Sequence, residues 1–237
     1  MTIIAMWSGP RNLSTAMMRS FGSRADCSVM DEPFFAPYLS VSGNAHPGRA
    51  ETLACHECDP QKVSEMCRAK TQTAYSFQKH MPHHMLDGFP MNWAKGAKHF
   101  FLIRDPARVI ASYAKGREDF DIEDLGFARQ RQLWEQLGRP PVIDSLDILL
   151  WPRTMLSQLC RAIGIPFDKA MMSWEKGSRP EDGAWAPHWY KSVMESTGFT
   201  EPPKDRPVMP PQYQDMLKAC EADYKIMEAR KLTLKLA

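Results

Sequence analysis

Short apolar runs alternate with segments of helical periodicity along the chain, and this alternation restricts the possible folds more than any other feature. The runs predicted as buried strands are residues 2–7, 27–30, 75–78, 98–103 and 146–150. The segments predicted as helices are residues 12–21, 61–70, 122–137, 152–163 and 213–231, with a further helix opening at Pro106. Alternating strands and helices are typical of an α/β protein with a largely parallel sheet covered on both faces.

Composition fits one globular domain spanning residues 1–237, since 43% of the residues are hydrophobic and 24% are charged. Within it, residues 41–60 are predicted to be a surface loop, and residues 174–211 an irregular segment rich in loops. The 30 basic and 28 acidic residues give a net charge of +2, which gives no support for a nucleic-acid partner.

The sequence contains no membrane or secretion signal that we recognise. No apolar run approaches the roughly 18 residues of a membrane span, and the apolar N-terminus lacks the basic region of a signal peptide. The six cysteines are expected to be thiols in a reducing compartment. These observations predict a cytoplasmic protein without a membrane partner.

The loop after the first predicted strand has the character of an anion site. Ligands of parallel α/β sheets bind beyond the carboxyl ends of the strands, where the loops at 8–15, 31–38, 79–84 and 104–106 are expected to meet. The first of these loops precedes a helix and contains Arg11, Ser14 and Thr15. Helix N–H groups, a guanidinium and hydroxyls together suit a phosphate or sulfate ester. The alternative is a solvated turn with a salt-bridged arginine.

This loop departs from the Walker A pattern of Mg-ATP enzymes. When the pattern is started at Gly9, the second glycine falls on Ser14, the lysine on Thr15 and the hydroxyl residue on Ala16. A kinase or ATPase is therefore disfavoured.

A second anion site is predicted after the strand at 98–103. Arg104 ends this strand, and Ser112 follows eight positions later, about two turns into the helix that opens at Pro106. A guanidinium and a hydroxyl in this arrangement can converge on one phosphate. The alternative is that Asp105 and backbone carbonyls satisfy Arg104 while Ser112 faces solvent.

Together, the two loops resemble those of the PAPS-dependent sulfotransferases. The segment Pro10-Arg11-Asn12-Leu13-Ser14-Thr15 is similar to their 5′-phosphosulfate loop. The segment from Phe101 to Pro106 with Ser112 is similar to their 3′-phosphate motif. A further strand–helix segment, residues 148–166, is similar to one in many bacterial members, so that the resemblance spans roughly residues 2–174.

The resemblance implies a P-loop-NTPase-like three-layer α/β/α fold and a sulfotransferase. PAPS (3′-phosphoadenosine-5′-phosphosulfate) would be the co-substrate and PAP the product, and no metal would be required. The sulfuryl group would pass to a hydroxyl or amine of a small-molecule acceptor. The 5′-phosphosulfate would be bound by the loop residues Pro10, Arg11, Asn12, Leu13, Ser14 and Thr15, and the 3′-phosphate by Arg104 and Ser112.

One departure from the family pattern leaves other functions open. Leu13 stands where the family has glycine, and a positive φ in this loop is tolerated by Asn12 but poorly by Leu13. The alternatives are a non-catalytic module that binds PAP and, less favoured, a nucleotide-dependent kinase.

The resemblance implies that Arg11 stabilises the leaving group and leaves two candidates for the catalytic base. Glu32 follows the second strand, and a carboxyl beside apolar side chains can have the raised pKa of a base. His80 precedes Pro82 in a setting used by cytosolic members, with Lys79 next to it. Glu32 is slightly favoured. The alternatives are a capping or ion-pairing role for Glu32 and a surface turn for His80.

Three other groups of residues suggest chemistry without a specific pattern. Cys55-His56-Glu57-Cys58 lies near His46 and Cys67, but the spacing does not match a structural zinc site. His83 and His84, which lie near His80, could also ligate a metal, but a metal is disfavoured there as well. Trp185, His188, Trp189 and Tyr190 either line an acceptor pocket or anchor a long loop.

Overall fold

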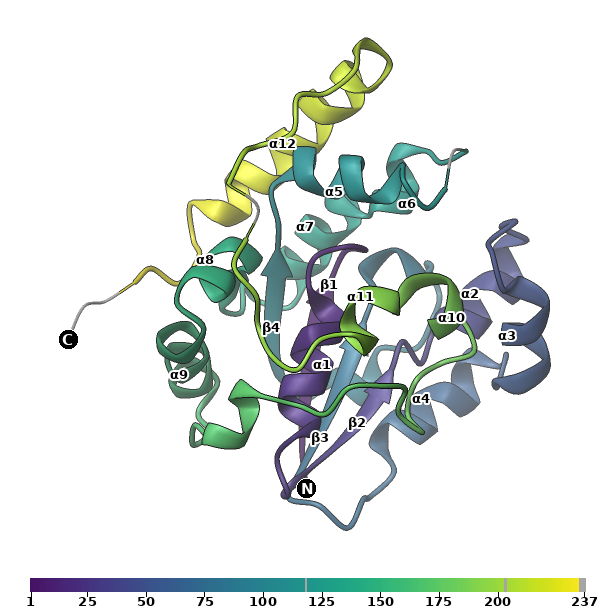
Figure 1. The fold of residues 1–237 in the computed structure, drawn as a ribbon. Coiled ribbons are helices and arrows are strands. Elements are labelled where there is room, and N and C mark those ends of the chain that lie inside the picture. Colours follow the sequence, from purple (N-terminus) through teal and green to yellow (C-terminus); the bar gives the residue numbers. More distant parts are fainter. Residues whose placement is uncertain (118, 203, 235–237) are drawn as a thin grey trace.

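A parallel β-sheet forms the centre of the protein in a computed structural model that describes residues 1–117, 119–202 and 204–234. The strands are β1 (Thr2–Ser8), β2 (Cys27–Asp31), β3 (Tyr75–His80), β4 (Lys98–Ile103) and β5 (Val142–Asp144). Their order in the sheet is β2-β3-β1-β4-β5, and every neighbouring pair is parallel (Figure 1). Helices therefore provide the crossovers between strands.

Helices cover both faces of the sheet, which confirms the predicted three-layer α/β/α architecture. One face packs against α1 (Ser14–Gly22), α8 (Ser145–Leu150) and α9 (Pro152–Ile163), and the other against α4 (Pro60–Arg68), α7 (Phe127–Gln136) and α12 (Gln214–Glu228). Further helices are α2 (Phe35–Ser42), α3 (Arg49–Cys55), α5 (Pro106–Tyr113), α6 (Ile122–Leu125), α10 (Ala186–Trp189) and α11 (Lys191–Met194). Successive strand residues enter opposite cores, as Met6 and Trp7 of β1 do.

The predicted strand at residues 146–150 is wrong, because Ser145–Leu150 form helix α8. The strand of this unit is the three-residue β5, which pairs with β4. Asp144 ends β5, and its carboxylate accepts a hydrogen bond of 2.7 Å from the Leu146 amide, which caps the helix. A short apolar run does not reveal by periodicity alone whether it is a strand or a buried helix.

Two other segments differ from the prediction at glycines with left-handed backbone angles. Residues 41–60 contain helix α3, which follows Gly48 (φ 76°), rather than forming only a loop. The helix expected at 122–137 is divided by Gly126 (φ 71°) into α6 and α7. Residues 174–211 are rich in loops as predicted, apart from the short helices α10 and α11, and residue 203 lies outside the described residues.

The carboxyl ends of the strands form the edge where the site was predicted. The loops after β1, β2, β3 and β4 contribute to one cavity there, and a segment from Gly183 to Glu201 runs across it. We call residues 183–201, which include α10 and α11, the covering segment (green in Figure 1). None of the helices in the described part of the chain is long and apolar enough to cross a membrane.

Candidate active site

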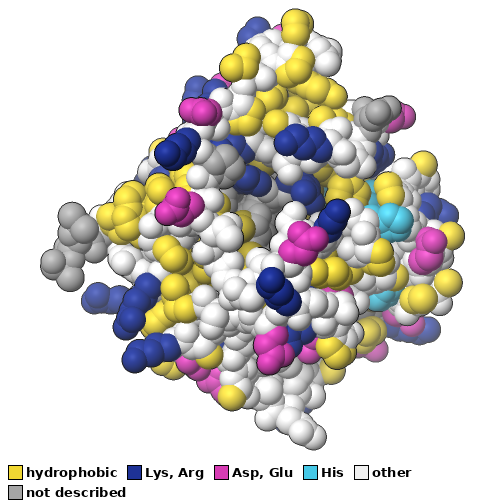
Figure 2. Space-filling model, viewed as in Figure 1, with side chains coloured by type: hydrophobic (Ala, Val, Ile, Leu, Met, Phe, Trp, Pro, Cys, Tyr) yellow, Lys and Arg dark blue, Asp and Glu magenta, His cyan; other side chains and the backbone are white. Residues whose placement is uncertain are grey.

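A cavity of about 380 Å³ lies at the carboxyl edge of the sheet. Its walls come from the β1–α1 loop, the ends of β2, β3 and β4, helix α5 and the covering segment. Figure 2 shows a hollow near the middle of this face with Lys and Arg side chains beside it. The cavity therefore brings together segments from most of the length of the chain.

The β1–α1 loop presents the start of helix α1 to this cavity. Pro10, Arg11, Leu13, Ser14 and Thr15 all line it. Leu13 occupies the N-cap position and has no side-chain hydrogen bond to the first turn of α1. The N–H groups of a first helical turn lack partners within the helix, so this end of α1 is suited to an anion.

The backbone angles of Leu13 and the orientation of the Asn12 side chain differ from what the sequence predicted. Leu13, at the position of the family's glycine, has φ 76° and ψ 9°, whereas Asn12 is not among the residues with positive φ. The Asn12 side chain is buried and donates a hydrogen bond of 3.3 Å to the Leu102 carbonyl, and it does not contribute to the cavity wall. A left-handed backbone costs a non-glycine residue about 1–2 kcal/mol.

We expect Leu13→Gly to unfold at higher urea concentration than Leu13→Ala. Both substitutions remove the same packing contacts of the leucine with the core around α1, but only glycine removes the left-handed strain. The difference in unfolding free energy should be about 1 kcal/mol in favour of glycine. At a position with helical backbone angles, glycine would instead be the less stable variant. A more stable alanine variant would therefore show that Leu13 is not strained.

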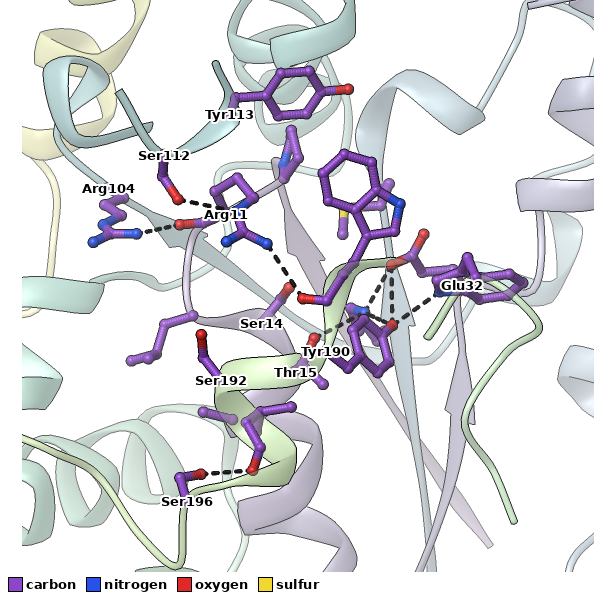
Figure 3. Close-up of a pocket in the computed structure, with 18 of the residues that line it drawn as sticks. Arg11, Ser14, Thr15, Glu32, Arg104, Ser112, Tyr113, Tyr190, Ser192 and Ser196 are labelled. Atoms are coloured by element: carbon purple, nitrogen blue, oxygen red, sulfur yellow. Dashed lines mark hydrogen bonds and ion pairs between the residues drawn. The ribbon is translucent and has the colours of Figure 1, made fainter. Parts of the chain in front are cut away.

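The two arginines and the serine of the predicted anion sites lie together. Arg11 Nε donates to Ser112 Oγ at 3.0 Å, and a terminal nitrogen of Arg11 donates to the Trp189 carbonyl at 3.3 Å. Arg104 donates to the carbonyl oxygen of Arg11. Figure 3 shows Arg104 and Ser112 on one side of Arg11, with Glu32 and Tyr190 across the cavity. The two predicted anion sites are thus neighbours joined by Arg11.

Neither arginine has a carboxylate within ion-pair distance among residues 1–117, 119–202 and 204–234. Burial lowers the pKa of the Arg11 guanidinium. Burial also lowers the pKa of Arg104, and the like charges of Arg108 and Arg11 add to this effect. Partly buried cations without counter-charges are costly, so this side of the cavity is electrostatically prepared for an anion.

Lys79 is the centre of a buried polar cluster on the other side of the cavity. Its ammonium lies 2.7 Å from Glu32 Oε1 and 2.9 Å from Asp31 Oδ1, and it also donates to Tyr190 Oη. Thr15 of the anion-binding loop accepts a further hydrogen bond of 3.3 Å from Lys79. Burial alone would lower the pKa of Lys79, but Asp31 and Glu32 raise it above its ordinary value, so the lysine is charged.

Glu32 has one carboxylate oxygen on Lys79 and the other facing His84. Its Oε2 lies 3.9 Å from His84 Nδ1, which is buried and has no hydrogen-bond partner in the described chain. Burial raises the pKa of Glu32, and Asp31 adds to the rise while Lys79 opposes it. Glu32 also has φ 41°, a left-handed value. A carboxyl with a raised pKa and a free oxygen in a cavity is suited to accept a proton.

His80 lies on the opposite face of the sheet from Lys79. Adjacent strand residues point in opposite directions, and the His80 ring stacks on Trp7 and Trp93 at centroid distances of 4.9 and 4.3 Å. It is 1% exposed and does not line the cavity. Burial lowers the pKa of His80 well below its ordinary value. The structure therefore brings Glu32 into the cavity and keeps His80 out of it.

Three residues around Lys79 lay outside the predicted site. Asp31 binds Lys79, the Gly183 amide and Tyr190 Oη, the last at 2.7 Å. Trp185 and Tyr190, predicted either to line an acceptor pocket or to anchor a long loop, both line the cavity, and Trp185 Nε1 donates to Tyr190 Oη at 2.9 Å. The pairing of Asp31 with Tyr190 joins positions too far apart for any local pattern to reveal it.

The cysteine and histidine groups considered for metal binding have other contacts. Cys58 Sγ donates to the carbonyls of Leu53 and His56, and His56 Nε2 accepts from the Ala184 amide. No three His, Cys, Asp or Glu side chains form a metal-binding group within the ranges that the structure describes.

A parallel sheet whose first strand leads through a short loop to a helix N-terminus at the cavity defines a P-loop-like α/β protein. The sequence pattern of the sulfotransferase domain family matches residues 1–231, so the chain belongs to this family.

Solved structures of sulfotransferases share the fold. The sulfotransferase domain from the curacin biosynthetic pathway has a TM-score of 0.61 at 15% identity and covers 94% of this chain and 97% of its own. A sulfotransferase from Alicyclobacillus acidocaldarius has a TM-score of 0.54 at 12% identity and covers 98% and 97%. These likenesses support the P-loop-NTPase-like fold implied by the sequence.

Two curated relatives from Arabidopsis thaliana are much longer proteins. Branched-chain-amino-acid aminotransferase-like proteins 1 and 2 are 38% and 37% identical to this chain over 232 residues, or 96% of it. The chain spans 42% and 41% of their lengths. Their names refer to whole proteins, and the part that matches this chain is less than half of each. The names do not mention sulfuryl transfer.

Proposed function

We propose that this chain transfers the sulfuryl group of PAPS to a hydroxyl or amine of a small-molecule acceptor. The observation that carries the proposal is one cavity whose two sides carry different charged groups. On one side Arg11 and Arg104 lie without a carboxylate partner in the described chain, and on the other Glu32 lies beside Lys79. The first side suits the phosphates of a donor, and the second suits an acceptor that must lose a proton.

The donor side has the groups needed for a molecule with phosphates at both ends of its ribose. The uncapped start of α1 and the hydroxyls of Ser14 and Thr15 would bind the 5′-phosphosulfate. Arg104 and Ser112 would bind the 3′-phosphate through charge-assisted and hydroxyl hydrogen bonds. Arg11 belongs to this loop and also contacts Ser112, so it would bridge the two ends.

The acceptor side supplies a base. Glu32 Oε2 has no donor in the described chain, so it is the oxygen that would accept the acceptor's proton as the new O–S or N–S bond forms. Lys79 holds Oε1 and thereby fixes the direction of Oε2. The aromatic rings of Phe35, Trp185 and Trp189 line the same part of the cavity and would exclude water from the reacting groups.

Charge on the donor must be neutralised as its bridging oxygen leaves. Lys79 reaches Thr15 of the anion-binding loop and Glu32 at once, so its ammonium would lie beside the transferred group. Arg11 would stabilise the leaving oxygen from the other side. Positioned cations of this kind contribute most of the barrier lowering when the protein makes no covalent bond.

A non-catalytic module that binds PAP is the second candidate, and the left-handed Leu13 in the anion-binding loop favours it. The two candidates differ in turnover. A module would bind PAP but would form no sulfated product with any member of an acceptor panel.

Isothermal titration with PAP tests the donor assignment. We expect wild-type protein to bind PAP and Arg104→Ala to bind it about 10- to 100-fold more weakly, because a hydrogen bond to a charged group is lost. Arg153→Ala, an exposed arginine on α9, is the control and should bind like wild type. Binding of Mg-ATP without any binding of PAP would contradict the proposal and favour the kinase.

A further inference from the structure

A second cavity of about 240 Å³ adjoins the first at Arg104. Arg104 and Leu149 line both cavities, so the guanidinium lies at the boundary between them. The outer cavity is formed by the end of β4, the start of α5, the β5–α8 turn and residues of α12. Nothing in the proposed donor or acceptor binding described above uses it.

Arg108 adds a third cation to the pair formed by Arg11 and Arg104. It lies on α5 four residues before Ser112, so the two residues share one face of this helix. Its side chain lines the outer cavity and has no ion pair or hydrogen bond within the described ranges. The mutual repulsion of Arg104 and Arg108 is evident in the lowered pKa of Arg104, to which burial and then Arg108 contribute.

The carboxylates of the outer cavity are engaged with other groups. Asp105 caps α5 and pairs with Arg206 at 2.7 Å. Asp144 accepts hydrogen bonds from the Leu146 amide and from Tyr224 Oη, and Glu228 accepts one from Tyr224 as well. The charges left without a partner at the boundary of the two cavities are therefore the positive ones.

Ser145 supplies an independent indication of a ligand. Its side chain lines the outer cavity and is 1% exposed, and its hydroxyl has no hydrogen-bond partner in the described chain. A buried hydroxyl without a partner costs about 1–3 kcal/mol. A ligand with acceptor oxygens in this cavity would satisfy it.

We propose that Arg108 and Ser145 form the outer half of the site for the donor's 3′-phosphate. The phosphate monoester would lie between the guanidinium groups of Arg104 and Arg108, with hydroxyl donors from Ser112 and Ser145. A dianion would relieve the repulsion between the arginines and satisfy the buried serine at once. The inference rests on the proposed function and adds to it: these two residues set the preference for a 3′-phosphorylated nucleotide.

The test is a comparison of PAP with adenosine 5′-phosphate, which lacks only the 3′-phosphate. Titration calorimetry at one fixed salt concentration gives both dissociation constants for wild type, Arg108→Ala, Ser145→Ala and the control Arg153→Ala. We expect Arg108→Ala to weaken PAP about 10- to 100-fold and Ser145→Ala about 2- to 10-fold, with adenosine 5′-phosphate changed less than about 3-fold. Thermal unfolding without ligand checks that each variant is folded, and Arg108→Gln replaces Arg108→Ala if that variant is not.

The possible failures are distinguishable. If Arg108→Ala weakens both nucleotides equally, or neither, the inference is wrong while the donor assignment stands. If wild type binds both nucleotides equally well, no part of the protein recognises a 3′-phosphate. If wild type binds neither, the proposed function fails as well.

Discussion

Glu32→Gln should abolish sulfuryl transfer while leaving PAP binding intact. The expected loss in kcat is about 10²- to 10⁴-fold, the usual contribution of a positioned general base. Glutamine is nearly isosteric and keeps an oxygen for Lys79, whose ammonium remains paired with Asp31 at 2.9 Å. The dissociation constant for PAP should therefore change by less than about 3-fold, since the substitution leaves Arg11, Arg104 and Ser112, the groups assigned to its phosphates, unchanged.

The pH dependence supplies a second measurement of the same group. Burial raises the pKa of Glu32, with Asp31 adding and Lys79 opposing, so in the wild type the base becomes protonated at a higher pH than an ordinary glutamate, whose pKa is about 4.3. The base acts as the carboxylate, so kcat/KM should fall as the pH is lowered through this raised pKa. The acid limb should be absent from the residual activity of Glu32→Gln.

Glu195→Gln on the surface is the matched control, because it makes the same chemical change outside the cavity. His80→Ala addresses the rival base. If a folded His80→Ala protein loses turnover while Glu32→Gln keeps it, our choice of base is wrong. We expect the reverse, since the His80 ring packs against Trp7 and Trp93 on the other side of the sheet.

Arg11→Ala is expected to give the second large effect, a fall in kcat of about 10²- to 10³-fold, typical for loss of one charged donor at a developing negative charge. The guanidinium reaches Ser112 and the Trp189 carbonyl, so its loss also removes a link between the anion-binding loop, α5 and the covering segment. Steady-state kinetics with PAPS varied up to saturation separates the two roles: stabilisation of the leaving oxygen lowers kcat, whereas simple donor binding raises KM alone.

Arg11→Lys distinguishes charge from geometry. A lysine keeps the positive charge but cannot donate in two directions from one planar group, so this variant should recover part of the kcat lost in Arg11→Ala. An unchanged kcat in Arg11→Ala, with KM raised, would mean that Arg11 binds the donor without aiding departure of the leaving group.

Local patterns were sufficient to locate the cavity. The apolar run at 2–7 followed by the Arg11 loop, and the strand ending at Arg104, predicted the two loops that face each other at the carboxyl edge. Parallel strands must present their carboxyl ends at one edge, so this part of the prediction needed no long-range information. The helix α8 was missed because a five-residue run with four apolar residues fits a strand as well as a helix turn.

The acceptor side was harder to predict, because its contacts join distant positions. Asp31 meets Tyr190 only after the covering segment has crossed the cavity. One signal was present in the sequence, however. Lys79 and His80 are neighbours in a strand, and a strand directs neighbours to opposite faces. The sequence therefore excluded a cavity containing both side chains, although choosing between them required the packing of Phe77 and Lys79 on the α1 face.

Whether Lys79 or His80 faces the cavity depends on the register of strand β3. Tyr75 pairs with Thr2, and every later pair up to Trp7 and His80 follows from it. A shift of β3 by a single residue would exchange the two faces of the strand. The imidazole of His80 would then lie beside Asp31, and the ammonium of Lys79 would be buried against the indole rings of Trp7 and Trp93. Insertion of one residue in the loop before Tyr75 should therefore leave activity intact, whereas one inserted within β3 should abolish both folding and turnover.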